Sequence, residues 1–267
     1  MPAWRLIVEY DGTRYSGWQE QKQARTVAGE IRAAAERSLL ERVELAGAGR
    51  TDAGVHALGQ VARLVARKRA ANDQLKFAIN DLLPPDINVL RVEKCDLRFD
   101  PRRDAVLRYY IYQIATRRTA FAKKYVWWVR DRLDTALMQK ATEALVGRND
   151  FRAFSERRGD ETSTVVVVDQ VELAAQGDLI LFRIGASHYL WKMVRRIVGS
   201  LVEVGRGSLS VPDFISLLDP RASSRRLTEY LVAAHTAPPS GLFLERVLYE
   251  SEPAPPPLAP AFPVRDV

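Results

Sequence analysis

The chain has 267 residues, a length that suits one large domain or two domains with cores of their own. Its 47% hydrophobic and 27% charged residues are typical of a folded protein and exclude a disordered or collagen-like chain. The net charge of +7 favours a polyanionic partner, for which nucleic acid is the first candidate and an acidic membrane surface the second.

Cysteine and histidine content bears on metal binding and on compartment. The one cysteine excludes an internal disulfide and a thiolate metal cluster, and the three histidines lie too far apart along the chain for a compact metal motif. No apolar run is long enough to span a bilayer, and the first residues lack a signal-peptide core. We therefore expect a cytoplasmic protein that holds no metal and no disulfide.

The first hundred residues predict a mixed unit of strands and helices. Trp4, Leu6 and Val8 alternate as in a strand, and Thr26 can cap a helix. Consecutive prolines from Pro84 stop a second helix. The expected elements are strands at 4–10, 58–65 and 87–92 and helices from residue 27 and over 75–82.

A second unit of the same kind follows a charged stretch at 99–104. Asp134 can cap a helix, and Ser210 with Pro212 can start a short one. The further expected elements are strands at 106–114, 165–173, 179–184 and 242–249 and a helix over 190–204. The sequence thus predicts an α+β protein with an N-terminal half at 1–104, a C-terminal half at 105–250 and a Pro-rich flexible tail at 251–267.

The segment 46–57 has the most unusual composition in the chain. Three glycines surround Asp52 between two expected strands, which predicts a loop that turns tightly or approaches another group closely. One interpretation is a structural turn in which Asp52 bonds to its own backbone. Both phosphate-loop motifs fail, because Asp52 stands where the dinucleotide motif needs glycine and no Gly-Lys-Ser/Thr sequence occurs.

This segment resembles the catalytic motif of the TruA family of tRNA pseudouridine synthases. The resemblance continues in the same order along nearly the whole chain, up to about Tyr249. The matching stretches are Glu9–Gln21, Thr26–Gly29, Arg50–Val61, Asn80–Ile87, Arg108–Ile114, Met193–Gly199 and Ala237–Leu242. The resemblance implies an enzyme that isomerises uridine to pseudouridine in the anticodon stem-loop of tRNA, at positions 38–40. It also implies a homodimer with tRNA as its partner.

The fold that the resemblance implies is a central pseudouridine-synthase sheet, largely antiparallel, built from two similar α/β halves with an active-site cleft between them. The reaction breaks the bond from N1 to C1′ and joins C5 to C1′, so it needs no redox cofactor and no metal, and we expect neither. It does need a carboxylate beside the ribose, and the resemblance gives that catalytic role to Asp52. Whether the carboxylate acts as nucleophile or as base stays open.

Two residues of the second half join the site by resemblance. Arg195 lies on the apolar stripe of the expected 190–204 helix, four residues after Trp191, and a buried guanidinium needs a carboxylate partner. The resemblance implies that this partner is Asp52, while a guanidinium that reaches solvent or pairs with a structural acid is the alternative. For Tyr110 it implies stacking on the target uracil, against the alternative of ordinary packing within a strand.

The resemblance gives further substrate-binding roles to Arg50, in the first half, and to Leu244, in the last expected strand. Arg50 is expected to fill the gap or hold the nucleotide when the uridine flips out, with a surface phosphate contact as the alternative. Leu244 is expected to form an apolar wall against the uracil, or else to pack in the core. Lys192 and Arg196 are expected on another helix face as solvated charges or phosphate contacts.

The remaining basic and imidazole groups receive more general roles. His56 is expected to be a hydrogen-bonded packing residue. Further cations are expected to add to the general electrostatic footprint for RNA: Arg63, Arg67, Lys68, Arg69, Lys123 and Lys124. Asp100, His188 and Arg196 depart from the pattern common in the family, which bears on the choice of RNA.

Two other classes of protein compete with this interpretation. The stretch Glu9–Thr13 approaches the Asp-x-Asp-Gly-Thr loop of haloacid-dehalogenase-like phosphohydrolases, but Glu9 stands where the nucleophilic Asp is needed. A non-catalytic RNA-binding protein is the stronger alternative, because basic charge and aromatic residues support binding without turnover. Asp52 together with Arg195 favours the enzyme.

Overall fold

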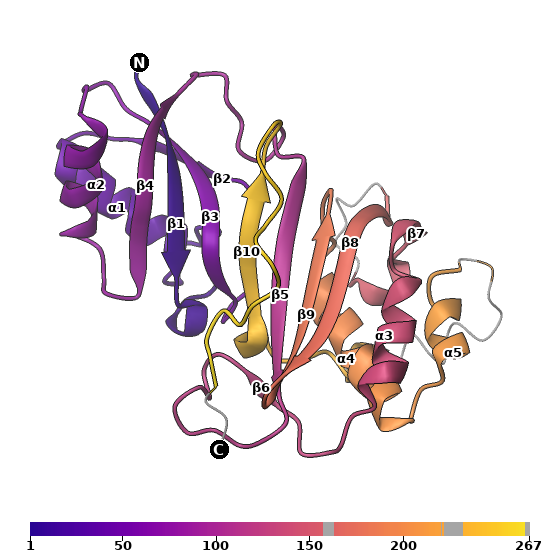
Figure 1. Ribbon diagram of the computed structural model, residues 1–267. Helices are drawn as coiled ribbons and strands as arrows, with labels where there is room; N and C mark the ends of the chain where they lie inside the picture. The colour runs from indigo at the N-terminus through magenta and orange to yellow at the C-terminus, as the bar shows by residue number, and fades with distance from the viewer. Residues whose placement is uncertain (157–162, 220, 222–231, 265–267) are drawn as a thin grey trace. The chain divides into compact units, whose positions relative to one another are not determined.

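The computed structural model describes residues 1–156, 163–219, 221 and 232–264. The chain forms two compact units: unit 1 comprises Met1–Val106 and Phe243–Ala254, and unit 2 comprises Leu107–Leu242 and Pro255–Val267. Each unit has a largely antiparallel sheet with helices (Figure 1), so the predicted α+β class is confirmed. Over the described ranges, no helix combines the length and the apolar character needed to cross a membrane.

The sheet of unit 1 has the strand order β4-β1-β3-β10, with β2 paired to β3. Its strands are β1 (Ala3–Tyr10), β2 (Glu44–Gly47), β3 (His56–Val65), β4 (Ile87–Cys95) and β10 (Leu242–Leu248). All pairs are antiparallel except β3 with β10, in which Leu244 lies opposite Ala57. Trp4, Leu6 and Val8 of β1 are fully buried, as their alternation predicts.

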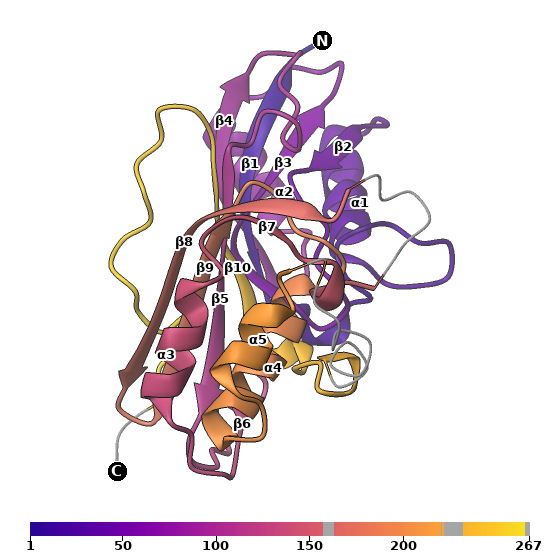
Figure 2. The ribbon, with the colours of Figure 1, turned by 90° about the vertical axis from the view of Figure 1, so that its right-hand side faces the viewer.

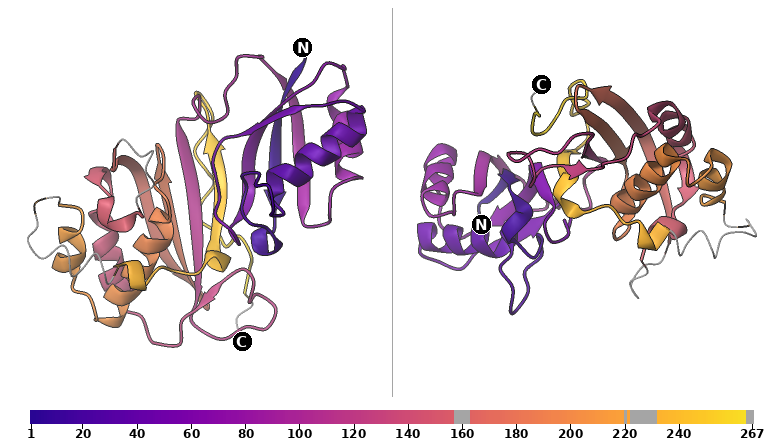
Figure 3. Two further views of the ribbon diagram at one scale, coloured as in Figure 1. Left: turned by 180° about the vertical axis from the view of Figure 1, so that it is seen from behind. Right: turned by 90° about the horizontal axis from the view of Figure 1, so that it is seen from below.

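Two helices, α1 (Val27–Leu39) and α2 (Asn72–Asn80), contact each other and cover one face of this sheet (Figure 3). The N-terminus of α1 is the predicted one, because Thr26 Oγ1 accepts a hydrogen bond from Gly29 N at 3.3 Å. Val27 and Ile31 are fully buried on its inner stripe. A short 3-10 helix, η1 (Gly12–Arg14), follows β1.

The sheet of unit 2 has the strand order β5-β9-β8-β7, with β6 paired to β5. Its strands are β5 (Leu107–Ala115), β6 (Trp127–Trp128), β7 (Gly147–Asp150), β8 (Val165–Gln176) and β9 (Leu179–Ala186). β6 is parallel to β5, and the other pairs are antiparallel. Every residue of β9 is buried, so this strand lies at the centre of the core of unit 2.

Three helices pack together on one face of this second sheet (Figure 2). They are α3 (Thr135–Glu143), α4 (Met193–Arg206) and α5 (Val211–Ser216), with short 3-10 helices η2 (Arg152–Phe154) and η3 (Pro239–Gly241). Asp134 caps α3 as predicted, since its carboxylate accepts from Ala136 N and Leu137 N at 3.0 Å each. Phe154 and Phe214 pack their rings 5.6 Å apart.

Helix α4 starts three residues later than predicted. Lys192 has φ of 62°, in the left-handed region, and the helix begins with Met193. Trp191 therefore lies outside the helix, and it does not share a helical stripe with Arg195 as expected. Val198, which lies within the helix, is fully buried.

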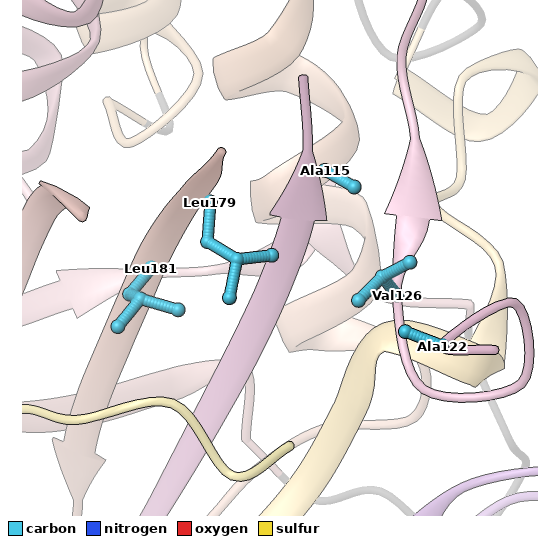
Figure 4. Close-up of a cluster of buried hydrophobic side chains, with 5 residues drawn as sticks. All are labelled: Ala115, Ala122, Val126, Leu179 and Leu181. Carbon is cyan, nitrogen blue, oxygen red and sulfur yellow. The ribbon is translucent and has the colours of Figure 1, made fainter. Parts of the chain in front are cut away.

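The segment after Pro255 packs against unit 2, which differs from the expected separate flexible tail. Leu258, Phe262 and Val264 lie against a buried cluster shown in Figure 4, which consists of Ala115, Ala122, Val126, Leu179 and Leu181. Phe262 N donates to Gln113 Oε1 at 3.1 Å, and Gln113 Nε2 donates to the Phe262 carbonyl oxygen at 3.3 Å. The apolar residues between the prolines supply a face to bury.

Candidate active site

The loop that carries Asp52 joins β2 to β3 in unit 1 and is fastened on both sides. On one side Ala48 N donates to Val61 O at 2.8 Å, and Gln60 Nε2 donates to Gly49 O at 3.0 Å. On the other side Trp18 N donates to Thr51 O at 3.1 Å. These bonds fix the backbone directly before Asp52, which is partly buried.

The segment at Gly17 approaches this loop too closely for a side chain. Gly17 has φ of +90°, and a Cβ atom there would lie 2.5 Å from Thr51 O and 3.2 Å from Asp52 C. Only glycine satisfies both the left-handed backbone and the close approach. Gly17 in the first matching stretch therefore has a structural reason, which is its close contact with the Asp52 loop.

His56 and Asp11 have structural partners in unit 1. His56 is 1% exposed, its Nδ1 accepts from Gly12 N at 3.1 Å, and its ring stacks on Phe243 at 4.7 Å. This agrees with the expected packing role. Asp11 Oδ1 accepts from Thr13 N at 2.9 Å and caps η1, so the stretch that resembles a phosphohydrolase loop forms a capped turn.

Arg50 and Leu244 occupy different environments within unit 1. Arg50 is exposed and lines a pocket of about 560 Å³ together with Trp18, Gly49 and Arg102. Leu244 is 1% exposed on β10. An exposed guanidinium beside this pocket is able to bind phosphate or stack on a base. The burial of Leu244 agrees with either of its expected roles.

Tyr110 lies on β5 of unit 2 and is braced by Tyr189. The two rings meet edge to face with centroids 4.9 Å apart, and Tyr110 is 8% exposed. The Tyr189 hydroxyl is directed at two carbonyl oxygens, Ile184 O at 2.8 Å and Arg108 O at 3.0 Å. Burial raises the pKa of Tyr189, so its phenol stays protonated and can donate.

Arg195 lies on α4 and is held by the segment before η3. Its Nε donates to Ala237 O at 2.7 Å, and Ala237 N donates to Arg195 O at 3.0 Å. Tyr112, on β5, donates its hydroxyl to Pro238 O at 2.7 Å. Burial raises the pKa of Tyr112 while the Arg195 charge opposes the rise. The same segment comes so near α4 that a Cβ at Gly199 would lie 1.7 Å from His235 O.

Lys192 and Arg196 were expected to be solvated charges or phosphate contacts, and the solvated alternative is wrong for Arg196. Arg196 is 8% exposed and donates through Nη1 to Ser155 O, and burial lowers the pKa of its guanidinium. Lys192 pairs with Glu156 at 2.6 Å and lies 4.4 Å from the centroid of the Trp191 ring. Both cations hold the chain around residue 155 to the start of α4.

Unit 1 thus carries Arg50, Asp52 and Leu244, and unit 2 carries Tyr110 and Arg195. The sequence did not single out the residues that support them, which are Tyr10, Trp18, Tyr112, Tyr189 and Ala237. A signal existed for Tyr112, which shares a strand face with Tyr110. The sequence carried no signal for Tyr189, because this residue lies between β9 and α4, outside any regular element.

Comparison with known proteins agrees with these features. A family model described as tRNA pseudouridine synthase matches residues 6–103 and 141–250. Proteins named tRNA pseudouridine synthase A are similar along most of the chain. The one from Afipia carboxidovorans is 38% identical over 93% of this chain and 100% of its own length. Those from Thermodesulfovibrio yellowstonii (35%; 92% and 98%) and Brucella ovis (37%; 93% and 98%) are similar in the same way.

These matches and the mixed α/β fold define an isomerase that modifies RNA. The chain belongs to the tRNA pseudouridine synthase family, as the resemblance predicts. Among solved structures, a chain of "Crystal Structure of a Cbf5-Nop10-Gar1 Complex" aligns with 74% of this chain and 54% of its own length at 12% identity. The TM-score of this alignment is 0.29.

Proposed function

We propose that this protein isomerises uridine to pseudouridine in the anticodon stem-loop of tRNA, at positions 38–40, with the carboxylate of Asp52 as the essential group. The observation that carries the proposal is the fastening of the Asp52 loop, in which Thr51 is bonded from Tyr10 and from Trp18. A carboxylate that reacts beside a ribose needs a fixed position, and backbone fixed on both sides supplies it.

The reaction balances without an added reagent. The N1–C1′ bond breaks, the uracil turns, and C5 joins C1′; C5 then loses its proton and N1 gains one. Asp52 acts as nucleophile or as base on the sugar. Arg195 is the cationic partner proposed for this carboxylate during the reaction.

The other site residues are proposed to handle the base. Tyr110 stacks on the uracil while its bond to ribose is broken, and Leu244 offers an apolar wall. Arg50 takes the place of the flipped nucleotide or holds its phosphate. We further propose that the enzyme works as a homodimer in the cytoplasm, on tRNA.

The test compares the native protein with Asp52→Ala on an unmodified tRNA transcript that has uridine at positions 38–40. Pseudouridine is mapped by mass spectrometry, and RNA affinity is measured by filter binding. Asp81→Ala is the matched control, because Asp81 is an exposed acid of unit 1 just beyond α2. We expect product with the native protein and with Asp81→Ala, and none with Asp52→Ala, which still binds.

Two results would contradict the proposal. Product formation by Asp52→Ala at the native rate would remove the carboxylate from the chemistry. Binding of the transcript by all three proteins without any pseudouridine would favour a non-catalytic RNA-binding protein.

A further inference from the structure

Residues 116–132 of unit 2, which we call the 116–132 loop, expose aromatic and basic side chains together. The loop follows β5, includes β6 and precedes α3. Phe121 is 93% exposed and Trp128 is 42% exposed, both unusual for aromatic rings in water. The exposed cations of the loop are Arg118, Lys123, Lys124, Arg130 and Arg132.

Two acids at this loop, within the described part of the chain, pair with arginines. Asp131, the one acid within the loop, pairs with Arg206 at 2.7 Å. Asp178 pairs with Arg117. The cations of residues 116–132 outnumber the one acid among them, so the loop carries a net positive charge that complements a polyanion.

The loop is held in place although its tip is exposed. Ala122, directly after Phe121, is 1% exposed, and it lies with Val126 in the buried cluster of Figure 4. Val129 N donates to Ala115 O at 3.0 Å. Tyr125 stacks on Phe262 of the C-terminal segment at 4.6 Å. The position of the Phe121 backbone is thus fixed before any partner binds, which lowers the entropy lost on binding.

We propose that the 116–132 loop binds RNA outside the reacting nucleotide, with Phe121 stacked on an unpaired base and the cations on adjoining phosphates. Flat apolar rings between Lys and Arg suit nucleic acid, because each nucleotide offers a ring face and a phosphate. The Arg118 guanidinium, 6.0 Å from the centroid of the Trp128 ring, adds a second charged and planar contact. The proposal rests on the proposed function, which supplies tRNA as the RNA.

The experiment measures tRNA affinity at several salt concentrations and conversion under single-turnover conditions at saturating enzyme. The variants are Phe121→Ala and the double variant Lys123→Ala/Arg130→Ala. Their matched controls in unit 1 are Phe77→Ala, an aromatic residue 60% exposed on α2, and Arg42→Ala/Lys94→Ala, which removes two other exposed cations.

We expect Phe121→Ala to weaken tRNA binding about 5- to 150-fold, the range for loss of one stacked base. The Lys123→Ala/Arg130→Ala variant should weaken binding. It should also make the salt dependence shallower, because the magnitude of the slope of log affinity against log salt falls by about 2. The controls should bind like the native protein. At saturating enzyme the rate of conversion should stay native in Phe121→Ala and in both control variants, because none of these residues belongs to the proposed catalytic machinery.

Native affinity and native salt slope in both loop variants would overturn the proposal. So would a change of oligomeric state in sedimentation without a change of RNA affinity, since the surface would then contact protein. Failure of the proposed function is distinguishable from both results. In that case the native protein makes no pseudouridine, while the affinity comparison still tests the loop.

Discussion

The hydroxyls of Tyr10 and Thr51 share a hydrogen bond of 2.7 Å across 41 positions of sequence. The bond joins β1 to the residue directly before Asp52, and both partners are buried. Burial raises the pKa of Tyr10, which keeps its phenol protonated. The central strand of unit 1 thereby fixes the loop of the proposed catalytic carboxylate.

Tyr10→Phe should separate the support of the loop from its chemistry. The change removes one partner of a buried hydrogen bond, so the free energy of unfolding should fall by about 1 to 2 kcal/mol. Because the Asp52 loop loosens, kcat on tRNA should also fall. Tyr249→Phe is the control, since its hydroxyl donates to Pro101 O at 2.8 Å elsewhere in unit 1. A similar kcat for the two variants would contradict the prediction.

Tyr112→Phe should act through Arg195. Without the hydroxyl the partly buried Pro238 carbonyl loses its donor, and the segment that accepts from Arg195 Nε is less well fixed. Steady-state assays should show a lower kcat with KM for tRNA nearly unchanged. Tyr109→Phe on the same strand loses only a 3.5 Å contact with Asp169 and should keep the native kcat. An unchanged kcat in Tyr112→Phe would exclude this role.

Phe262→Ala should show that the C-terminal segment stabilises unit 2. Phe262 is partly buried, so the loss should be about 1 to 2 kcal/mol, below the about 3 to 5 kcal/mol of a fully buried Phe. Denaturant unfolding measures it. Phe121→Ala provides the control, because its ring is 93% exposed and its removal should leave stability unchanged. Equal midpoints for Phe262→Ala and the native protein would show that the packed segment adds no stability.

His188 should make stability depend on pH. Although His188 as a residue is exposed, partial desolvation of its ring, and to a lesser extent the charge of Arg108, lowers its pKa in the folded protein. The unfolded chain therefore binds the proton more tightly. The contribution is fully present above the unfolded pKa of about 6.5 and is lost as pH falls through that value toward the folded pKa. Melting temperatures at about pH 7.5 and about pH 5.5 should differ less in His188→Asn than in the native protein; equal differences would refute the assignment.

The secondary structure could be predicted where the cause is local. The alternation in β1 and the Thr26 cap of α1 lie within a few residues and are read directly from the sequence. β6 has only two residues and exists because Trp127 pairs with Ile114, which no local pattern carries. The local pattern also did not predict the left-handed conformation of Lys192, which places Trp191 outside the helix that carries Arg195.

The candidate site divides in the same way. The proposed site residues were predicted from a family resemblance that short motifs carry. The groups that position these residues are distant from them in sequence. Tyr112 bonds to Pro238, 126 positions away, and Tyr10 bonds to Thr51. Such pairs depend on the completed sheets, and a single sequence has no periodicity that reports them.

The path of the chain also sets the order in which the units can be completed during synthesis. Unit 1 ends its first segment at Val106 and resumes at Phe243, so the ribosome delivers β10 only after most of unit 2. Until then β3 lacks its parallel partner at His56 and Ala57. Unit 2 in turn waits for Pro255 and the residues after it. A nascent chain therefore carries an unpaired strand edge for most of its translation. Because such an edge can pair with other chains, we expect a chaperone to protect the chain against aggregation mainly during this interval.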